Sequence, residues 1–169
     1  VDRNPEPAPW SRALGLQART LEIFDALGVL SAIRQHSKQV EAVHVHNQNG
    51  QLFDLDLTGL DAPFPWLLSC PQPQVERCLE DHYLALGGHL VRGVELAEFR
   101  QEGHTVTSSL QELGTGTHHS LESDLVVGCD GGHSSVRQQL GISFEGMELA
   151  DHFLLADVQV PWSLESNAA

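Results

Sequence analysis

The segment from Val126 to Gly141, VVGCDGGHSSVRQQLG, places an acid in a turn that could bind a ligand. We expect an apolar strand over 125–129, then Asp130, two glycines that permit positive φ angles, and a helix that begins at the serines, where Ser135 and Gln138 have the spacing of a capping box. In open α/β sheets ligands bind at the carboxyl ends of strands, where a carboxylate can accept hydrogen bonds from two hydroxyls. The alternative is an Asx turn, in which Asp130 binds only local amides. The motif alone is compatible with both interpretations.

Three more polar side chains have types and positions that suit nucleotide binding. Asp2 ends an expected strand, and an acid at the end of the second strand of a dinucleotide-binding unit typically binds the adenosine ribose. Arg12 follows a proline loop and precedes a helix, where its guanidinium could bind a pyrophosphate; a lone arginine can equally be a solvated surface charge. Gln72 stands between two prolines at the start of a helix, as a ligand-binding amide or as a helix cap. Considered together with Asp130, these positions favour a nucleotide site.

Ten histidines make a metal site the other chemistry to consider. In a strand, His44 and His46 would point to the same face and could chelate a metal. No neighbouring Cys, Asp or Glu at recurrent spacing completes a tetrahedral set. We therefore expect a solvated strand face there, a loop surface at His133 in the Asp130 turn, and no metal site.

The first half of the chain must position Arg12 and Gln72. The prolines before residue 10 favour an extended loop, and the apolar spacing of QARTLEIFDALG predicts a helix that Gly28 ends. Period-two alternation over about 40–57 with a turn at NQNG predicts a β-hairpin with one solvated face. A short strand at 66–70 then leads into a helix over PQPQVERCLEDHYLALGG.

The second half must position Asp130. Short segments from His89 to Ser123, separated by EG and GTGT, predict a small antiparallel meander. Residues 125–127 are apolar on both faces, as a buried parallel strand requires. One more strand is expected at FLLADVQV, before a polar tail.

Composition excludes several classes of function. The 169 residues, 41% of them hydrophobic, suffice for one ordinary domain. The formal charge of -14 argues against nucleic acid and anionic membranes as partners. No apolar run approaches the length of a membrane span, and three cysteines without metal-ligand spacing suit reduced thiols in a cytoplasmic protein.

Four motifs in this order resemble class A flavoprotein monooxygenases of the para-hydroxybenzoate hydroxylase type, from Val1 to about Val160. They are VDR, SRALGLQARTLEIFDALGV, CPQPQVERCLEDHYLALG and VVGCDGGHSSVRQQLGI. The second motif is most similar to hydroxylases of phenols and aromatic polyketides. The resemblance implies an α/β fold: a partial FAD-binding domain, Rossmann-like and of the glutathione-reductase type, with a mainly parallel sheet, a β-meander and the start of an antiparallel substrate-domain sheet.

The resemblance also implies a set of cofactor-binding residues. Asp2 matches the acid that binds the adenosine ribose, Arg3 its basic neighbour on the adenine side, and Arg12 the arginine that contacts the pyrophosphate. Gln72 matches a glutamine near the flavin phosphate and the ribityl chain, and Leu96 matches a position whose backbone atoms contact the adenine. Asp130 and Gly131 match the Asp-Gly motif, which serves FAD and the approach of NAD(P)H. No catalytic residue is assigned.

The implied reaction is that of an FAD-dependent monooxygenase. NAD(P)H would reduce FAD, and a flavin hydroperoxide would transfer one oxygen atom from O2 to a small phenolic or polyketide aromatic substrate. A homo-oligomer is also compatible with the resemblance. Two alternatives stay open as well: an inactive truncated remnant or interaction module, and a flavoprotein reductase or dehydrogenase of the same fold.

The family's GxGxxG loop, expected roughly 20 residues before Asp2, is not in this sequence. The later Gly-Asp motif and most of the substrate domain are not in it either. We therefore expect a fragment without a complete flavin site, which would be inactive alone. Its residues 1–145 would be a partial FAD/NAD(P)-binding domain with a hairpin inserted at about 40–70, and residues 146–169 would begin a truncated substrate-binding domain.

Overall fold

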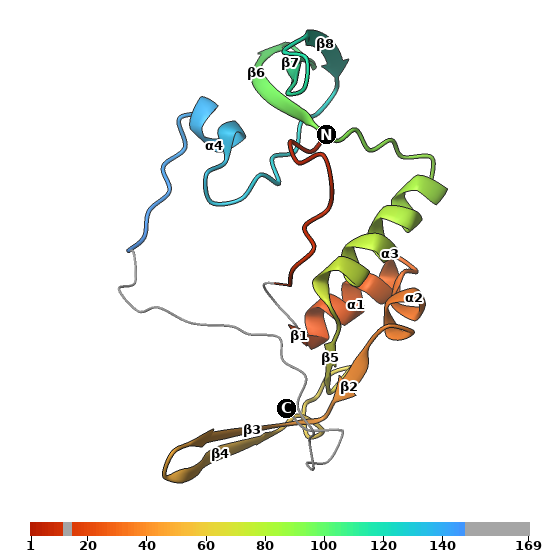
Figure 1. Ribbon diagram of the computed structural model, residues 1–169, viewed down its shortest axis with the longest axis vertical. Helices are drawn as coiled ribbons and strands as arrows, with labels where there is room; N and C mark the ends of the chain where they lie inside the picture. The colour runs from red at the N-terminus through yellow and green to blue at the C-terminus, as the bar shows by residue number, and fades with distance from the viewer. Residues whose placement is uncertain (12–14, 148–169) are drawn as a thin grey trace. The chain divides into compact units, whose positions relative to one another are not determined.

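The computed structural model describes residues 1–11 and 15–147 (Figure 1). Arg12 and the expected strand at FLLADVQV lie outside the described residues. The chain divides into two compact units. Of the described residues, 7–11 and 15–88 belong to one unit, and 1–6 and 89–147 belong to the other. Each unit is described below by itself.

The unit that contains residues 15–88 joins a small sheet to three helices. Its antiparallel sheet has the order β1-β5-β2, formed by Gly15–Leu16, Leu67–Ser69 and Lys38–Val40. The helices are α1 (Ala18–Ala26), α2 (Leu30–Arg34) and α3 (Gln72–Ala85). Both long helices and the strand β5 were predicted, whereas α2, β1 and β2 are too short for a periodic signal.

Buried apolar side chains connect these helices to the sheet. One cluster contains Val29, Ile33, Cys70 and Val75, and a second contains Leu21, Leu30 and Leu68. Leu16 and Phe24 pack against both clusters. Gly28 ends α1 with a φ of 77°, in the left-handed region that favours glycine. The core therefore fixes the start of α3, where Gln72 lies.

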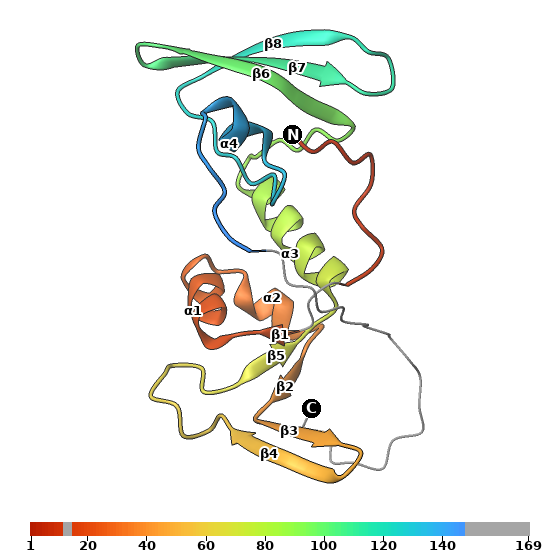
Figure 2. The same ribbon diagram turned by 90° about the vertical axis from the view of Figure 1, so that its left-hand side faces the viewer.

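The predicted hairpin is present as β3 (Ala42–Asn47) and β4 (Gly50–Asp56), and it lies apart from the helices in both views (Figure 1 and Figure 2). Val43 faces Leu55 and His44 faces Asp54 across the two strands. Phe53 and Leu55 are exposed, so the face expected to be buried is open in this chain.

The other unit is built on the predicted meander. Strands β6 (Val94–Glu102), β7 (Thr105–Glu112) and β8 (His118–Ser123) pair antiparallel in that order. The register of β6 against β7 shifts between Leu96 and Glu98, which leaves Ala97 as a bulge. The short helix α4 (Ser135–Gln139) follows the meander and contacts β6.

The expected mainly parallel sheet is not seen. Every paired strand within residues 1–11 and 15–147 is antiparallel, and the parallel pairing found there is the isolated bridge between Asp2 and Arg92. The expected strand over 125–129 is also wrong, because these residues form no strand and Leu125 and Val127 are 74% and 71% exposed. An apolar run becomes a buried strand only when neighbours supply hydrogen bonds and cover, and no described segment does so.

None of the helices described here combines the length and the apolar character that crossing a membrane would require.

Candidate functional site

Asp2 forms hydrogen bonds through both its main chain and its carboxylate. Its N–H donates to the Val91 carbonyl at 2.9 Å, and its carbonyl accepts from the Val94 N–H at 3.1 Å. Its carboxylate accepts from the Asn4 N–H at 2.9 Å through Oδ1 and from the Arg92 guanidinium at 3.0 Å through Oδ2. The extended N-terminal segment therefore presents an acid whose position is fixed.

The Asp2 carboxylate retains the capacity to bind a ligand. An ionised carboxylate offers about four lone-pair sites, and the bonds from Asn4 and Arg92 use one on each oxygen. The Asp2 side chain is 37% exposed. Partial exposure and one open acceptor site on each oxygen suit a vicinal diol, so these residues fit the adenosine ribose of FAD.

Arg3 lies beside the start of β6, and Leu96 is the third residue of that strand. An Arg3 guanidinium nitrogen is 3.8 Å from Glu95 Oε2, in an ion pair whose arginine is 68% exposed. Leu96 is half-buried and faces Leu110 of β7. The structure thus brings three expected site residues, Asp2, Arg3 and Leu96, to the first residues of one strand.

Asp130 binds the first turn of α4. Its Oδ1 accepts from the Ser134 hydroxyl, and its Oδ2 accepts from the N–H groups of Ser135 at 2.6 Å and Val136 at 3.3 Å. The Ser134 hydroxyl is the main cause that holds the pKa of Asp130 below its usual value, and the backbone N–H groups add to it. The local, amide-binding interpretation therefore describes most of what this carboxylate does in the structure.

The helix start is displaced by one residue from the predicted one. Ser134 is the N-cap and accepts from the Arg137 N–H at 3.1 Å, so the expected capping box of Ser135 and Gln138 does not form. The reason is that Asp130 orients the Ser134 hydroxyl by accepting its proton, which leaves the hydroxyl oxygen to cap the helix.

The glycines of this turn have different roles. Gly131 adopts a φ of 77°, as predicted, whereas Gly132 is not in the positive-φ region. A Cβ at Gly128 would lie 2.7 Å from the Cβ of Val136, which no side chain permits. Gly128 therefore allows the close approach of α4, and Gly131 makes the turn.

Gln72 begins α3 in the other unit. Its backbone N–H donates to Ser11 Oγ at 3.0 Å, and its side-chain amide donates to Glu76 Oε1 at 2.7 Å. The predicted position at the start of the helix is confirmed, with the two flanking prolines at the N-cap and inside the first turn. Its role in binding FAD stays a prediction.

Two residues that the sequence did not single out support the site. Arg92 binds Asp2 from 90 residues away. Gln139 of α4 satisfies the β6 bulge, because its amide donates to the Ala97 carbonyl at 3.2 Å and accepts from the Phe99 N–H at 3.1 Å. β6 is an edge strand of the meander, so Gln139 binds its outer edge and ties the Asp130 turn to the strand that carries Leu96. Neither contact has a local sequence signal.

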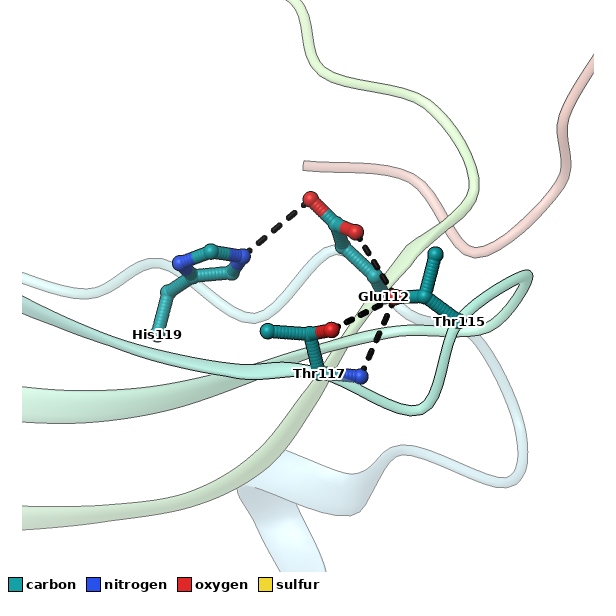
Figure 3. A network of polar contacts seen from close by, with 4 residues as sticks. All are labelled: Glu112, Thr115, Thr117 and His119. Atoms are coloured by element: carbon teal, nitrogen blue, oxygen red, sulfur yellow. Dashed lines mark hydrogen bonds and ion pairs between the residues drawn. The ribbon is translucent and has the colours of Figure 1, made fainter.

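A polar network at the β7–β8 turn has another role (Figure 3). Thr115 Oγ1 lies 2.8 Å from both Glu112 Oε2 and Thr117 Oγ1, and His119 Nε2 lies 3.1 Å from Glu112 Oε1. Because a hydroxyl has one proton, Thr117 donates to Thr115 when Thr115 donates to Glu112. This exposed network braces the turn.

Among the residues that the structure describes, no group of three or more His, Cys, Asp or Glu side chains is arranged to hold a metal ion. His44 instead contacts Asp54 across the hairpin.

The sequence matches known monooxygenases along most of its length. It is 33% identical over 158 residues to an uncharacterized aromatic compound monooxygenase, YhjG, of Bacillus subtilis (strain 168), covering 94% of this chain and 31% of that protein. It is 34% identical over 161 residues to the 12-dehydrotetracycline 5-monooxygenase/anhydrotetracycline 6-monooxygenase of Streptomyces rimosus, again covering 94% and 31%. The chain thus spans about a third of the length of these relatives.

A solved structure shares the fold. The anhydrotetracycline hydroxylase OxyS from Streptomyces rimosus superposes with a TM-score of 0.76 at 32% identity, covering 88% of this chain and 29% of OxyS. The family described as "FAD binding domain" matches residues 1–166. The expected α/β fold and the resemblance to aromatic monooxygenases are therefore confirmed, and the chain belongs to this family of FAD binding domains.

Proposed function

We propose that this chain forms the adenosine-binding part of the FAD site in an NAD(P)H-dependent monooxygenase that hydroxylates a phenolic or polyketide aromatic substrate. The observation that carries the proposal is the Asp2 carboxylate, which is fixed by Asn4 and Arg92 and keeps acceptor sites open on both oxygens. It occurs in a chain of the FAD binding domain family, whose relatives named above are monooxygenases of aromatic compounds and tetracyclines.

The residues of this chain would bind and orient the cofactor. Asp2 would accept the ribose hydroxyls, and Arg3 and the backbone at Leu96 would lie on the adenine side. Asp130 and Gly131 would face FAD and the approach of NAD(P)H, while Arg12 and Gln72 would serve the pyrophosphate and the flavin phosphate and ribityl region. FAD, when bound and reduced by NAD(P)H, supplies the oxygen chemistry that inserts one atom of O2 into the aromatic ring.

The position of Asp130 limits its part in this proposal. Three of its acceptor sites are already used by Ser134, Ser135 and Val136. About one site therefore remains for a ligand, and the main contribution of Asp130 would be to hold the turn at Gly131 in place. The proposed domain organisation is the one expected from the sequence, with residues 1–145 in the nucleotide-binding part and 146–169 beginning the substrate-binding part.

A substitution at Asp2 tests the cofactor site directly. In the protein that contains this chain, Asp2→Asn should weaken FAD binding about tenfold or more, because the amide offers one acceptor oxygen in place of two and its NH2 group faces the Arg92 donor. Flavin fluorescence titration measures the affinity. Asp25→Asn, on the exposed face of α1, is the control and should leave FAD affinity unchanged. An unchanged affinity in Asp2→Asn would reject the proposed site.

The proposed reaction has its own test. Substrate-stimulated NAD(P)H oxidation, with one atom of isotope-labelled O2 found in the aromatic product, is the expected result for the protein that contains this chain. Electron transfer to another acceptor without oxygen incorporation would instead indicate a reductase or dehydrogenase.

A further inference from the structure

Main-chain hydrogen bonds hold Arg92 and Asp2 next to each other. The Arg92 guanidinium donates to Asp2 Oδ2 at 3.0 Å, across 90 residues of sequence. The main chains of the two segments are bonded on either side of this contact, from Asp2 to Val91 and from Val94 to Asp2. The Arg92 side chain is 22% exposed, the lowest value among the arginines in the ion pairs described here. The pair therefore has a fixed place.

Arg92 orients a carboxylate that the Asn4 N–H also binds. The Asn4 N–H donates to Oδ1 while Arg92 donates to Oδ2, so one donor holds each oxygen of the carboxylate. A side chain held at both oxygens has lost its rotational freedom before a ligand arrives. Prior ordering of this kind lowers the entropic cost of binding.

We propose that Arg92 is a positioning residue, which holds the Asp2 carboxylate in the orientation that accepts the two hydroxyls of the FAD ribose. The inference rests on the proposed function of Asp2. Arg92 acts through Asp2 and is not itself assigned a contact with the cofactor.

A purely structural ion pair would behave differently. Partly exposed ion pairs contribute about 0–1 kcal/mol to stability, so removing Arg92 should change unfolding little. Its effect on FAD binding should be larger, because a hydrogen bond to a charged group is lost at the site that orients the ligand.

The test is a double-mutant cycle in the protein that contains this chain. Arg92→Gln should weaken FAD binding about tenfold in the wild-type background and by less than about twofold in the Asp2→Asn background. Arg92→Lys, which keeps a charged donor, should stay within about threefold of wild type. Affinity is measured by flavin fluorescence titration, and the unfolding midpoint is measured for every variant.

The matched control is Arg100→Gln, on the strand β6 that follows Arg92. Arg100 is 80% exposed and pairs with Glu102 at 3.8 Å, so its loss should leave FAD affinity unchanged. If Asp2→Asn weakens FAD binding and Arg92→Gln does not, the role of Arg92 is wrong while the function of Asp2 stands. Equal effects of Arg92→Gln in both backgrounds would also overturn it. If Asp2→Asn itself has no effect, the proposed function fails.

Discussion

At the residue scale, the turn at Asp130 joins three different physical requirements. Gly131 supplies a positive φ, Gly128 supplies space against Val136, and Asp130 accepts the hydroxyl and N–H groups that start α4. The two Asp interpretations that the sequence left balanced are thus not exclusive. A carboxylate used to build the turn can also keep an acceptor site for a ligand.

Gly128→Ala tests the close approach of α4. The added Cβ would meet the Val136 Cβ at 2.7 Å, and such overpacking costs about 1–3 kcal/mol of unfolding free energy. Gly132→Ala is the matched control in the same turn, because its Cβ would meet nothing within 4 Å and its φ is ordinary. It should stay within about 0.5 kcal/mol of wild type. Denaturant unfolding measures both, and equal stabilities would contradict the assignment.

At the element scale, the meander depends on contacts made at its irregular points. Next to its bulge the edge strand β6 presents the Ala97 carbonyl and the Phe99 N–H, and Gln139 binds both. The turn between β7 and β8 is braced by Glu112 and its threonine and histidine partners (Figure 3). Each site offers a separate test.

Gln139→Ala should loosen the bulge. Both bonds are on the surface, so water replaces them in part and the expected loss is about 0.5–1.5 kcal/mol. Hydrogen exchange at the Phe99 amide should accelerate, because that N–H loses its acceptor. Gln138→Ala is the control, since its amide donates to the carbonyl of His133 in its own turn, at 3.5 Å. Unchanged exchange at Phe99 in Gln139→Ala would show that the bulge does not need the amide.

Thr115→Val should raise the pKa of Glu112. The Thr115 hydroxyl is the largest cause that lowers this pKa from its usual 4.5, followed by the bond to His119. Since the pKa is depressed in the folded state, the contribution of Glu112 to stability is present above about pH 4.5 and is lost as pH falls through the folded pKa. NMR titration of Glu112 measures the shift.

The matched variant for this network is His119→Ala, which should raise the Glu112 pKa less than Thr115→Val does. The exposed side chains make the effect on stability small. A Glu112 pKa that is the same in Thr115→Val and in wild type would show that the hydroxyl does not bind the carboxylate in solution.

At the scale of the whole molecule, distant segments meet through a few specific bonds. The N-terminal residues reach the meander through the parallel bridge of Asp2 and Arg92, and α4 reaches it through Gln139. The FAD binding domain family gives the chain a nucleotide cofactor as its expected ligand. The FAD titrations of the Asp2 and Arg92 variants test whether FAD is that ligand.

The sequence by itself determined the elements that depend on local pattern. Apolar period and glycine caps predicted α1 and α3, alternation and turns predicted the β3–β4 hairpin and the meander, and the Asp-Gly turn was placed correctly with its positive φ at Gly131. These follow from backbone geometry and neighbours a few residues apart.

Only the tertiary structure decided the rest. Arg92 meets Asp2 across 90 residues and Gln139 meets Ala97 across 42, and no local pattern encodes such contacts. The exposure of Leu125 and Val127 was likewise missed, because burial is a property of what surrounds a segment, and an apolar run forms a strand only beside a neighbour that pairs with it.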